Sequence, residues 1–481
     1  MNRRPSLGAL LALTLFPVAV VVRSLQHHAS LLYPDGYQYL LMARGIVEHL
    51  QPTTVLGPGG DTFVPNADAA VKPLFPLAVA VVHAAGVPLV DAATLVTVAA
   101  GAWVVTAVAL LVRARSGSTV AGLAAGTLVL ASPSVAFWSG FSGPDPLAAA
   151  LVLSAALALV YRRARLGGVL MGLAIATRPE IVLLALAAGL LALRDERDRA
   201  LLRRAAPATL LTATLVFAVL RTPVAVPDWR LVSLVPAALI ALALVTRAPA
   251  ELLRYAGIAS LPLVALVVLD RPGPSTLWMD DRPLLLVAAV ALLILLCDRG
   301  RSSGALVVLA AVLLLGAVYL VKNPALGRYF ALLLPAAAIV AGLAVAAVPR
   351  RVRAAGVAAL AAVAAVSLLA PIPGSRDFDM FPRVAVGLEE RLLNGDEPLV
   401  TAAPDAYGFW LPDHAVKRMR PGMRGAILLD ATQRLYEPRL TAEGTVVARL
   451  DAVAFSRPDL EIDADPATLV AGRVVLDAVP G

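Results

Sequence analysis

The sequence is poor in cysteine, histidine and charge, and each shortage excludes a class of protein. Cys297 is the only cysteine in 481 residues, so the chain has neither a disulfide framework nor a thiolate metal site. The five histidines show no spacing typical of metal ligands. Charged residues make up only 15% of the chain, whereas soluble domains carry roughly 25%. The composition therefore excludes an ordinary soluble domain.

The chain is instead rich in long apolar runs, and 59% of its residues are hydrophobic. The net charge of +8 could suggest a nucleic-acid partner. However, the arginines lie in short clusters beside the apolar runs, and no basic patch with interleaved aromatic residues is present. Such clusters are topology signals of a membrane protein. We therefore expect a multi-pass protein of the plasma membrane that does not bind nucleic acid.

The first apolar run, Leu7–Val22, follows Arg3 and Arg4, which places the N-terminus in the cytoplasm. A cleavable signal peptide is the alternative, but a retained first span is favoured because the run is long and further spans follow. The next apolar run, Pro73–Val90, is expected to lie at the membrane surface without crossing. Only then do Arg113 and Arg115 face the cytoplasm. Residues 24–91 thus form the first external loop, with two surface helices.

A break occurs inside the apolar run Leu166–Leu193, at Arg178-Pro179-Glu180. Basic clusters flank the run, so both ends face the cytoplasm, yet the run is too short for two crossings of ~20 residues each. The pattern predicts a hairpin of two short helices with its tip at Arg178–Glu180, shielded by protein.

Counting both arms of the hairpin, we expect about thirteen membrane helices. The remaining expected spans are Ala92–Val112, Val120–Trp138, one from near Asp145, Pro207–Val226, Leu231–Val245, Tyr255–Leu269, Leu284–Cys297, Ala305–Val321, Ala331–Val348 and Gly356–Ala370. This count places the C-terminus outside.

The composition changes after Pro371-Ile372-Pro373-Gly374, and residues 371–481 are charged and mixed. A helix is expected over Asp377–Leu393. Short β-like runs follow at Pro398–Ala402, Ala426–Asp430, Val446–Phe455 and Arg473–Val479. We expect a small extracytoplasmic α/β domain without a nucleotide-binding glycine fingerprint. The fold class is therefore an α-helical polytopic membrane protein with this domain attached.

The stretch from Tyr33 to Leu50 predicts an amphipathic helix on the external membrane surface. Asp35 is a plausible N-cap, and Tyr39 shares its helix face. An apolar stripe follows, formed by Leu40, Leu41, Ile46, Val47 and Leu50. A carboxylate thus stands at the entrance of a surface helix.

Further polar sites converge on the same external face. They are Lys72-Pro73, Asp145, and the loop that holds Lys322, Arg328 and Tyr329, with Arg178 below them. Ionisable groups at membrane depth are functional candidates, because burying such a group costs several kcal/mol unless it is paired or serves a function. In contrast, Asp61, Asp68, Asp280 and Asp281 are interpreted as solvated loop acids.

Residues 7–348 resemble the GT-C-type integral membrane glycosyltransferases that use polyprenyl-phosphate sugars, such as protein mannosyltransferases and lipid A aminoarabinose transferases. Five motifs carry this resemblance: Asp35-Gly36-Tyr37-Gln38-Tyr39, Lys72-Pro73-Leu74-Phe75-Pro76, Ser142-Gly143-Pro144-Asp145-Pro146-Leu147, the stretch Gly172–Glu180, and Gly327-Arg328-Tyr329 before Leu334-Pro335. One departure is the single proline after Lys72, where relatives often have two.

The resemblance implies transfer of a mannose- or arabinose-like sugar from a polyprenyl-phosphate donor to an external glycan, lipid or protein, with inversion. Asp35 is the candidate base, and Asp145 is a second carboxylate that positions the acceptor or a divalent cation (Mg, Mn or Ca) or else caps a helix. The expected phosphate-binding residues are Lys72, Arg178, Lys322, Arg328 and Tyr329. Tyr39 and Glu180 are expected to support the site.

Alternative functions remain for these residues and for the chain. Lys72 and Arg328 could reach only the lipid headgroups, and Arg178 could form a structural pair with Glu180. A lipid or glycan transporter would show inverted repeats and acids in mid-membrane helices, which the sequence lacks. A catalytically inactive relative is the third alternative.

Overall fold

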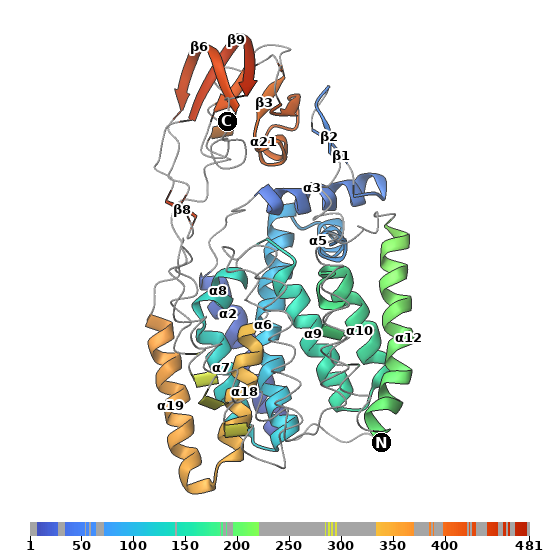
Figure 1. Cartoon of the computed structure of the whole chain (residues 1–481), viewed down its shortest axis with the longest axis vertical. Helices are drawn as coiled ribbons and strands as arrows, with labels where there is room; N and C mark the ends of the chain where they lie inside the picture. Colours follow the sequence, from blue (N-terminus) through green and yellow to red (C-terminus); the bar gives the residue numbers. More distant parts are fainter. Residues whose placement is uncertain are drawn as a thin grey trace.

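A computed structural model of the chain (Figure 1) describes residues 7–26, 34–220, 333–369 and 398–478, with short gaps inside these ranges. It also describes isolated residues between 284 and 295 and between 384 and 388. The spans expected at Leu231–Val245, Tyr255–Leu269 and Ala305–Val321, and most of Leu284–Cys297, lie outside the described residues. The expected number of thirteen helices therefore stays a prediction.

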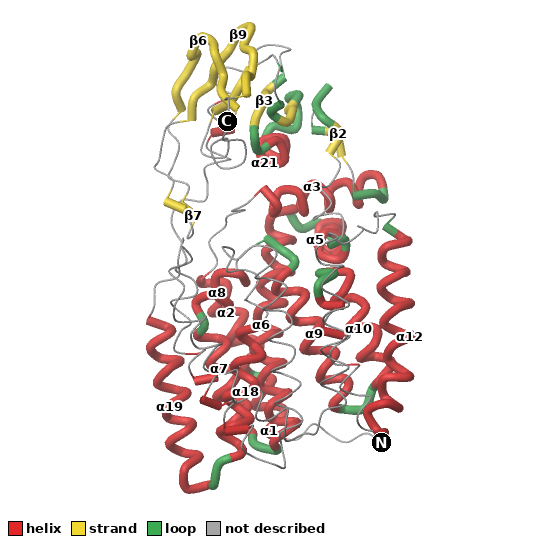
Figure 2. The backbone as a smooth tube through the Cα atoms, in the orientation of Figure 1, coloured by secondary structure: helices red, strands yellow, loops and turns green. Residues whose placement is uncertain are grey.

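The described N-terminal part is a bundle of apolar helices (Figures 1 and 2). Its helices are α1 (Leu7–Leu13), α2 (Leu15–Gln26), α6 (Leu89–Ser116), α7 (Thr119–Ala131), α8 (Pro133–Ser139), α9 (Asp145–Val160), α10 (Ala164–Thr177), α12 (Glu196–Val219), α18 (Leu333–Ala347) and α19 (Arg350–Leu369). Among the described residues, Leu7–Leu25, Leu89–Ser116, Asp198–Val219 and Arg351–Leu368 are long and apolar enough to cross a membrane. The protein is therefore a helical membrane protein.

The bundle core consists of small and branched side chains from α6, α7, α9, α18 and α19. The turn between α6 and α7 illustrates how local sequence ends one helix and starts the next. Gly117 ends α6 with a φ of +72°, a conformation that glycine adopts without strain. Ser118 then caps α7, because its hydroxyl accepts a hydrogen bond from the Ala121 amide at 3.2 Å.

The expected single span Val120–Trp138 is wrong, because the structure divides it into α7 and α8. Ser132 between them is extended, with φ −64° and ψ 119°. The following Pro133 explains the break, since proline disfavours helical geometry in the residue before it. The Ser132 hydroxyl accepts a hydrogen bond from the Val135 amide at 3.2 Å and so starts α8.

Two helices lie across one end of the bundle, namely α3 (Pro34–His49) and α5 (Leu74–Ala84) (Figure 1). An 11-residue helix such as α5 spans only about 16 Å, too little for a bilayer core of about 30 Å. The expectation that Pro73–Val90 does not cross the membrane stays a prediction. The Tyr39 and Phe75 rings join α3 to α5 edge to face, with centroids 5.6 Å apart.

The expected apolar stripe of α3 is only partly buried. Leu40, Leu41 and Ile46 are buried, whereas Val47 and Leu50 are 40% and 79% exposed. Leu50 has a positive φ of 56°, just after the helix ends at His49, so the stripe does not continue. At the other end, α3 begins at Pro34, which places Asp35 inside the first turn rather than at the predicted cap.

The C-terminal residues form a five-stranded mixed sheet of order β4-β3-β5-β9-β6. Its strands are β3 (Leu399–Thr401), β4 (Val416–Arg418), β5 (Ala426–Leu429), β6 (Leu440–Leu450) and β9 (Ala467–Ala478). Strand β3 runs parallel to β4 and β5, while β9 is antiparallel to β5 and β6. Helix α21 (Pro404–Trp410) connects β3 to β4. Strands β3, β5, β6 and β9 overlap the four β-like runs in the sequence.

A second hydrophobic core joins this C-terminal sheet to α3, α5 and the start of α6. It includes Leu40 of α3, Phe75 of α5 and Tyr407 of α21. Two short strands of the first loop, β1 (Thr54–Val55) and β2 (Thr62–Phe63), pair with each other nearby. Strands β7 (Ser456–Arg457) and β8 (Leu460–Glu461) form a separate pair. Helices α3 and α5 thus lie between the bundle and the sheet.

Candidate active site

Two helix ends meet inside the bundle and bring opposite charges together. Helix α9 begins at Asp145, after Pro144 as its N-cap residue. Helix α10 ends at Thr177, and Arg178 is extended with φ −147° and ψ 108°. Pro179 explains this conformation, as at Ser132. The predicted break at Arg178-Pro179-Glu180 is therefore present, and helical residues resume at Ile181.

Arg178 forms an ion pair with Asp145, through Nη1 and Oδ1. Its Nε also lies 3.7 Å from Glu180 Oε2. The three residues are buried, with exposed fractions of 2% for Arg178, 6% for Asp145 and 9% for Glu180. Charges this deeply buried are tolerated only when they are paired. We call Asp145, Arg178 and Glu180 the buried triad.

The contacts of the buried triad show which partners these residues have, while their roles stay predictions. Arg178 does pair with Glu180, but Asp145 is an additional partner from a different helix. Asp145 is the first residue of α9 and the N-cap position belongs to Pro144, so its carboxylate is engaged by a guanidinium instead of serving as the N-cap.

A small cavity lies beside Asp145, with a volume of roughly 20 Å³, enough for about one water molecule. Its wall includes Gly101 of α6, Trp138 and Ser139 of α8, and Pro335 of α18. Two motifs that resemble the glycosyltransferases, at residues 142–147 and 334–335, thus meet at one place in the fold. Leu334 is also buried, with 3% of its surface exposed.

The buried triad lies close to the layer formed by α3 and α5. Leu147, in the first turn of α9, packs against the core that contains Leu40 and Phe75. Helix α10, which leads to Arg178, also contacts α5. Lys72 lies two residues before α5 and is buried, with 5% exposed. Four of the five motifs, with Leu334-Pro335 of the fifth, therefore gather at the same end of the bundle.

The structure leaves several expected site residues without a described position. Lys322, Arg328 and Tyr329 lie outside the described residues. The backbone of Asp35 is helical in α3, while its side chain lies outside the described part of the structure. Tyr39 is buried and packs against Phe75. The roles assigned to these residues stay predictions.

A metal site at Asp145 does not fit the contacts that the structure shows. The Asp145 carboxylate already pairs with Arg178, whose charge would repel a metal ion at the same oxygen atoms. Among the described residues, no group of three His, Cys, Asp or Glu side chains is placed to hold a metal ion. We therefore derive no step that uses a divalent cation.

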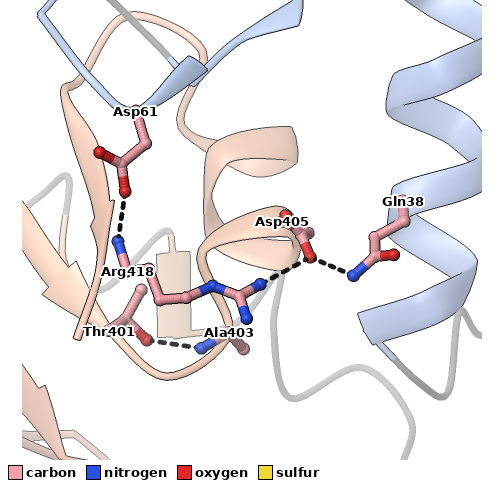
Figure 3. Close-up of polar contacts among 6 residues, drawn as sticks. All are labelled: Gln38, Asp61, Thr401, Ala403, Asp405 and Arg418. Atoms are coloured by element: carbon pink, nitrogen blue, oxygen red, sulfur yellow. Dashed lines mark hydrogen bonds and ion pairs between the residues drawn. The ribbon is translucent and has the colours of Figure 1, made fainter. Parts of the chain in front are cut away.

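A polar cluster between α3 and the C-terminal sheet was missed by the sequence analysis (Figure 3). Gln38 Nε2 donates a hydrogen bond to Asp405 Oδ2 at 2.6 Å, although the residues are 367 positions apart. Asp61, interpreted from the sequence as a solvated loop acid, is half-exposed and accepts a hydrogen bond from the Arg418 amide at 2.9 Å. No local pattern signals such long-range partners.

The same helix carries two groups whose pKa values are shifted by burial. Burial raises the pKa of Tyr37 above its usual value, although a hydrogen bond from Trp410 partly opposes the shift. The Trp410 indole donates this bond to the Tyr37 hydroxyl at 3.0 Å. Burial lowers the pKa of Arg44, and the neighbouring Glu48 opposes that shift. Tyr37 is therefore neutral at physiological pH.

No family profile and no curated protein matches this sequence. Solved structures do match its fold. ArnT from Cupriavidus metallidurans in the apo state aligns with a TM-score of 0.56 and 14% identity, covering 97% of this chain and 100% of that chain. ArnT bound to undecaprenyl phosphate aligns with a TM-score of 0.56 and 15% identity, covering 96% and 98%.

The archaeal oligosaccharyltransferase AglB from Archaeoglobus fulgidus, in complex with an inhibitory peptide and a dolichol-phosphate, is also similar. Its TM-score is 0.52 at 13% identity, covering 85% of this chain and 64% of that chain. ArnT and AglB are both GT-C glycosyltransferases. The likeness extends over almost the whole chain, and so the protein has the GT-C glycosyltransferase fold, as its motifs predict.

Proposed function

We propose that this protein is a membrane glycosyltransferase that moves a sugar from a polyprenyl-phosphate donor to an acceptor hydroxyl. The observation that carries the proposal is the buried triad at the end of the bundle next to α3 and α5. Burying these paired charges is costly, which favours a functional role for them. The fold that holds them is similar to the folds of ArnT and AglB. The ligands bound to those proteins, undecaprenyl phosphate and dolichol-phosphate, support a lipid-phosphate donor.

In the proposed reaction, the acceptor oxygen attacks the anomeric carbon and the bond from that carbon to the phosphate oxygen breaks. Asp35, in the first turn of α3, takes the proton from the acceptor hydroxyl. Attack opposite the leaving phosphate inverts the anomeric centre. The leaving phosphate carries the developing negative charge, which cations must stabilise.

The cations assigned to that phosphate are Lys72, Arg178, Lys322 and Arg328. Lys72 is buried where α5 begins, and Arg178 is oriented by its pairs with Asp145 and Glu180. A guanidinium held by carboxylates has its fork fixed before the donor binds, so less conformational entropy is lost on binding. Asp145 is thus proposed to orient Arg178 rather than to position the acceptor or a divalent cation.

The sugar is proposed to be mannose- or arabinose-like and the acceptor an external glycan, lipid or protein. The purified protein in lipid nanodiscs would be incubated with a panel of polyprenyl-phosphate sugars and candidate acceptors, with products identified by mass spectrometry. In parallel, glycoconjugates of wild-type and deletion cells would be compared. We expect a glycosylated product and free polyprenyl phosphate in equal amounts.

Movement of the intact donor across a vesicle bilayer without cleavage would contradict the proposal and favour a transporter. Cleavage without an acceptor product would indicate a hydrolase. The matched control for the base is Asp91→Asn, because Asp91 is an exposed acid in the first turn of α6. It should leave sugar transfer unchanged.

A further inference from the structure

A buried carboxylate connects the C-terminal sheet to helix α3. Asp405 lies in the first turn of α21 and is only 2% exposed. Its Oδ2 accepts the hydrogen bond from Gln38 of α3 and lies 3.7 Å from Arg418 Nη2 of β4. Figure 3 shows this oxygen between the two side chains. One carboxylate oxygen is therefore shared by a surface helix and an edge strand.

The segment that follows α3 is attached to the same strand. The amide of Val416 donates a hydrogen bond to the Leu56 carbonyl at 3.0 Å, and the Asp61 amide donates one to the Val416 carbonyl at 3.1 Å. The Asp61 carboxylate then accepts from the Arg418 amide. Because β4 is an edge strand of the sheet, these bonds satisfy groups that would otherwise be unpaired.

Apolar packing surrounds this polar connection but does not replace it. The Tyr37 and Phe409 rings lie 5.6 Å apart between α3 and α21. Such packing is non-directional and tolerates a small rotation of α3. A short hydrogen bond to a buried carboxylate is directional and charge-assisted, so it fixes the orientation of the helix.

Gln38 lies three residues after Asp35 on α3, and residues three apart share a helix face. We propose that Asp405 is a positioning residue: it holds Gln38 and thereby fixes the turn of α3 that carries Asp35. This inference rests on the proposed function, in which Asp35 takes the acceptor proton. Through Asp405, the C-terminal sheet sets the geometry of proton removal.

The expected signature is a loss of turnover without a loss of donor binding. Misplacing a reacting group by 1 Å can reduce a rate by about a hundredfold. The donor KM should change little, because the substitutions leave the cations assigned to the phosphate in place. A purely structural role would instead reduce the amount of folded protein and leave kcat per folded molecule unchanged.

The test compares Gln38→Glu, Asp405→Asn and the double variant. Gln38→Glu places a second carboxylate against Asp405, and we expect kcat to fall about ten- to a hundredfold, the cost of losing a charged hydrogen bond. In the double variant, the amide introduced at position 405 can donate to the carboxylate introduced at position 38. It should recover most of the lost kcat.

Thr401→Val is the matched control, because the Thr401 hydroxyl accepts a hydrogen bond from the Ala403 amide within the C-terminal segment. It perturbs the approach to α21 without touching α3, so its kcat should equal that of the wild type. Equal kcat in Gln38→Glu and the wild type, or failure of the double variant to recover, would overturn the positioning role.

A readout independent of catalysis separates this inference from the proposed function. Spin labels at Val47 and Asp413, both exposed, would report the distance between α3 and the C-terminal segment, with Cys297 replaced by serine. We expect Gln38→Glu to broaden the distance distribution and the double variant to narrow it again. An unchanged distribution in Gln38→Glu would refute the positioning role. Wild-type turnover of Asp35→Asn would instead refute the proposed base while leaving the distance result valid.

Discussion

Arg178 is the residue whose removal should be most costly, because it is the cation between two buried carboxylates. Arg178→Met retains similar volume and removes the guanidinium, with its charge and its N–H donors. It leaves Asp145 and Glu180 as neighbouring like charges in a site from which water is largely excluded.

The structure sets the size of this effect. At 3.7 Å and an effective dielectric constant of about 20, the attraction between Arg178 and Glu180 is about 4 kcal/mol before desolvation is subtracted. Removing one partner of a buried ion pair typically costs ~3–5 kcal/mol. We therefore expect Arg178→Met to lower the free energy of unfolding by about this amount.

Asp145→Asn should cost less, about 1.5–3 kcal/mol, because Arg178 keeps Glu180 as a partner. The free energies would be measured by titrating the purified protein with a denaturing detergent in mixed micelles under reversible conditions. Wild-type stability of Arg178→Met would refute the buried triad. The double variant Asp145→Asn, Arg178→Met should recover stability relative to Arg178→Met but not turnover, since the phosphate loses its cation in both.

Three further predictions follow from other parts of the chain. Gly172→Ala should destabilise the protein by about 1–3 kcal/mol, because the added Cβ would lie 2.5 Å from the Thr209 carbonyl oxygen of α12. Gly189→Ala is the control, because its added Cβ would lie 3.5 Å from the nearest atom. Equal Tm values for the two variants would contradict the close packing of α10 and α12. In a variant with Cys297 replaced, Asp413→Cys should react with an impermeant thiol reagent added outside intact cells, and Arg115→Cys should not. The reverse labelling pattern would contradict the expected orientation of the chain in the membrane. Arg328→Lys should reduce donor turnover about tenfold or more, because lysine lacks the planar guanidinium that binds phosphate through two hydrogen bonds. Steady-state kinetics equal to those of the wild type would show that Arg328 contacts only lipid headgroups.

Hydrophobicity and proline made much of the fold predictable from sequence. Apolar runs bounded by arginines located the described helices of the bundle, because the cost of burying charge in a membrane is large. Pro179 marked the break that holds Arg178. The same rule applies at Pro133, but the apolar residues on both sides hid that break and led to one expected span instead of α7 and α8.

The pairing of side chains was less predictable. Opposite charges at Asp145 and Arg178 were visible, but sequence could not say that the ends of α9 and α10 meet. Gln38 and Asp405 carry no shared pattern at all, because their contact depends on how the C-terminal sheet packs on α3. Tertiary packing decides such contacts, and local sequence does not encode it.

The most direct test of the proposed chemistry is the turnover of Asp35→Asn with a polyprenyl-phosphate sugar, measured beside Asp91→Asn in the same nanodiscs. A general base contributes about 10²- to 10⁴-fold to a rate. We predict a loss of that size for Asp35→Asn, with unchanged thermal stability and with Asp91→Asn at the wild-type rate. Turnover of Asp35→Asn near the wild-type rate would contradict the assignment of Asp35 as the base.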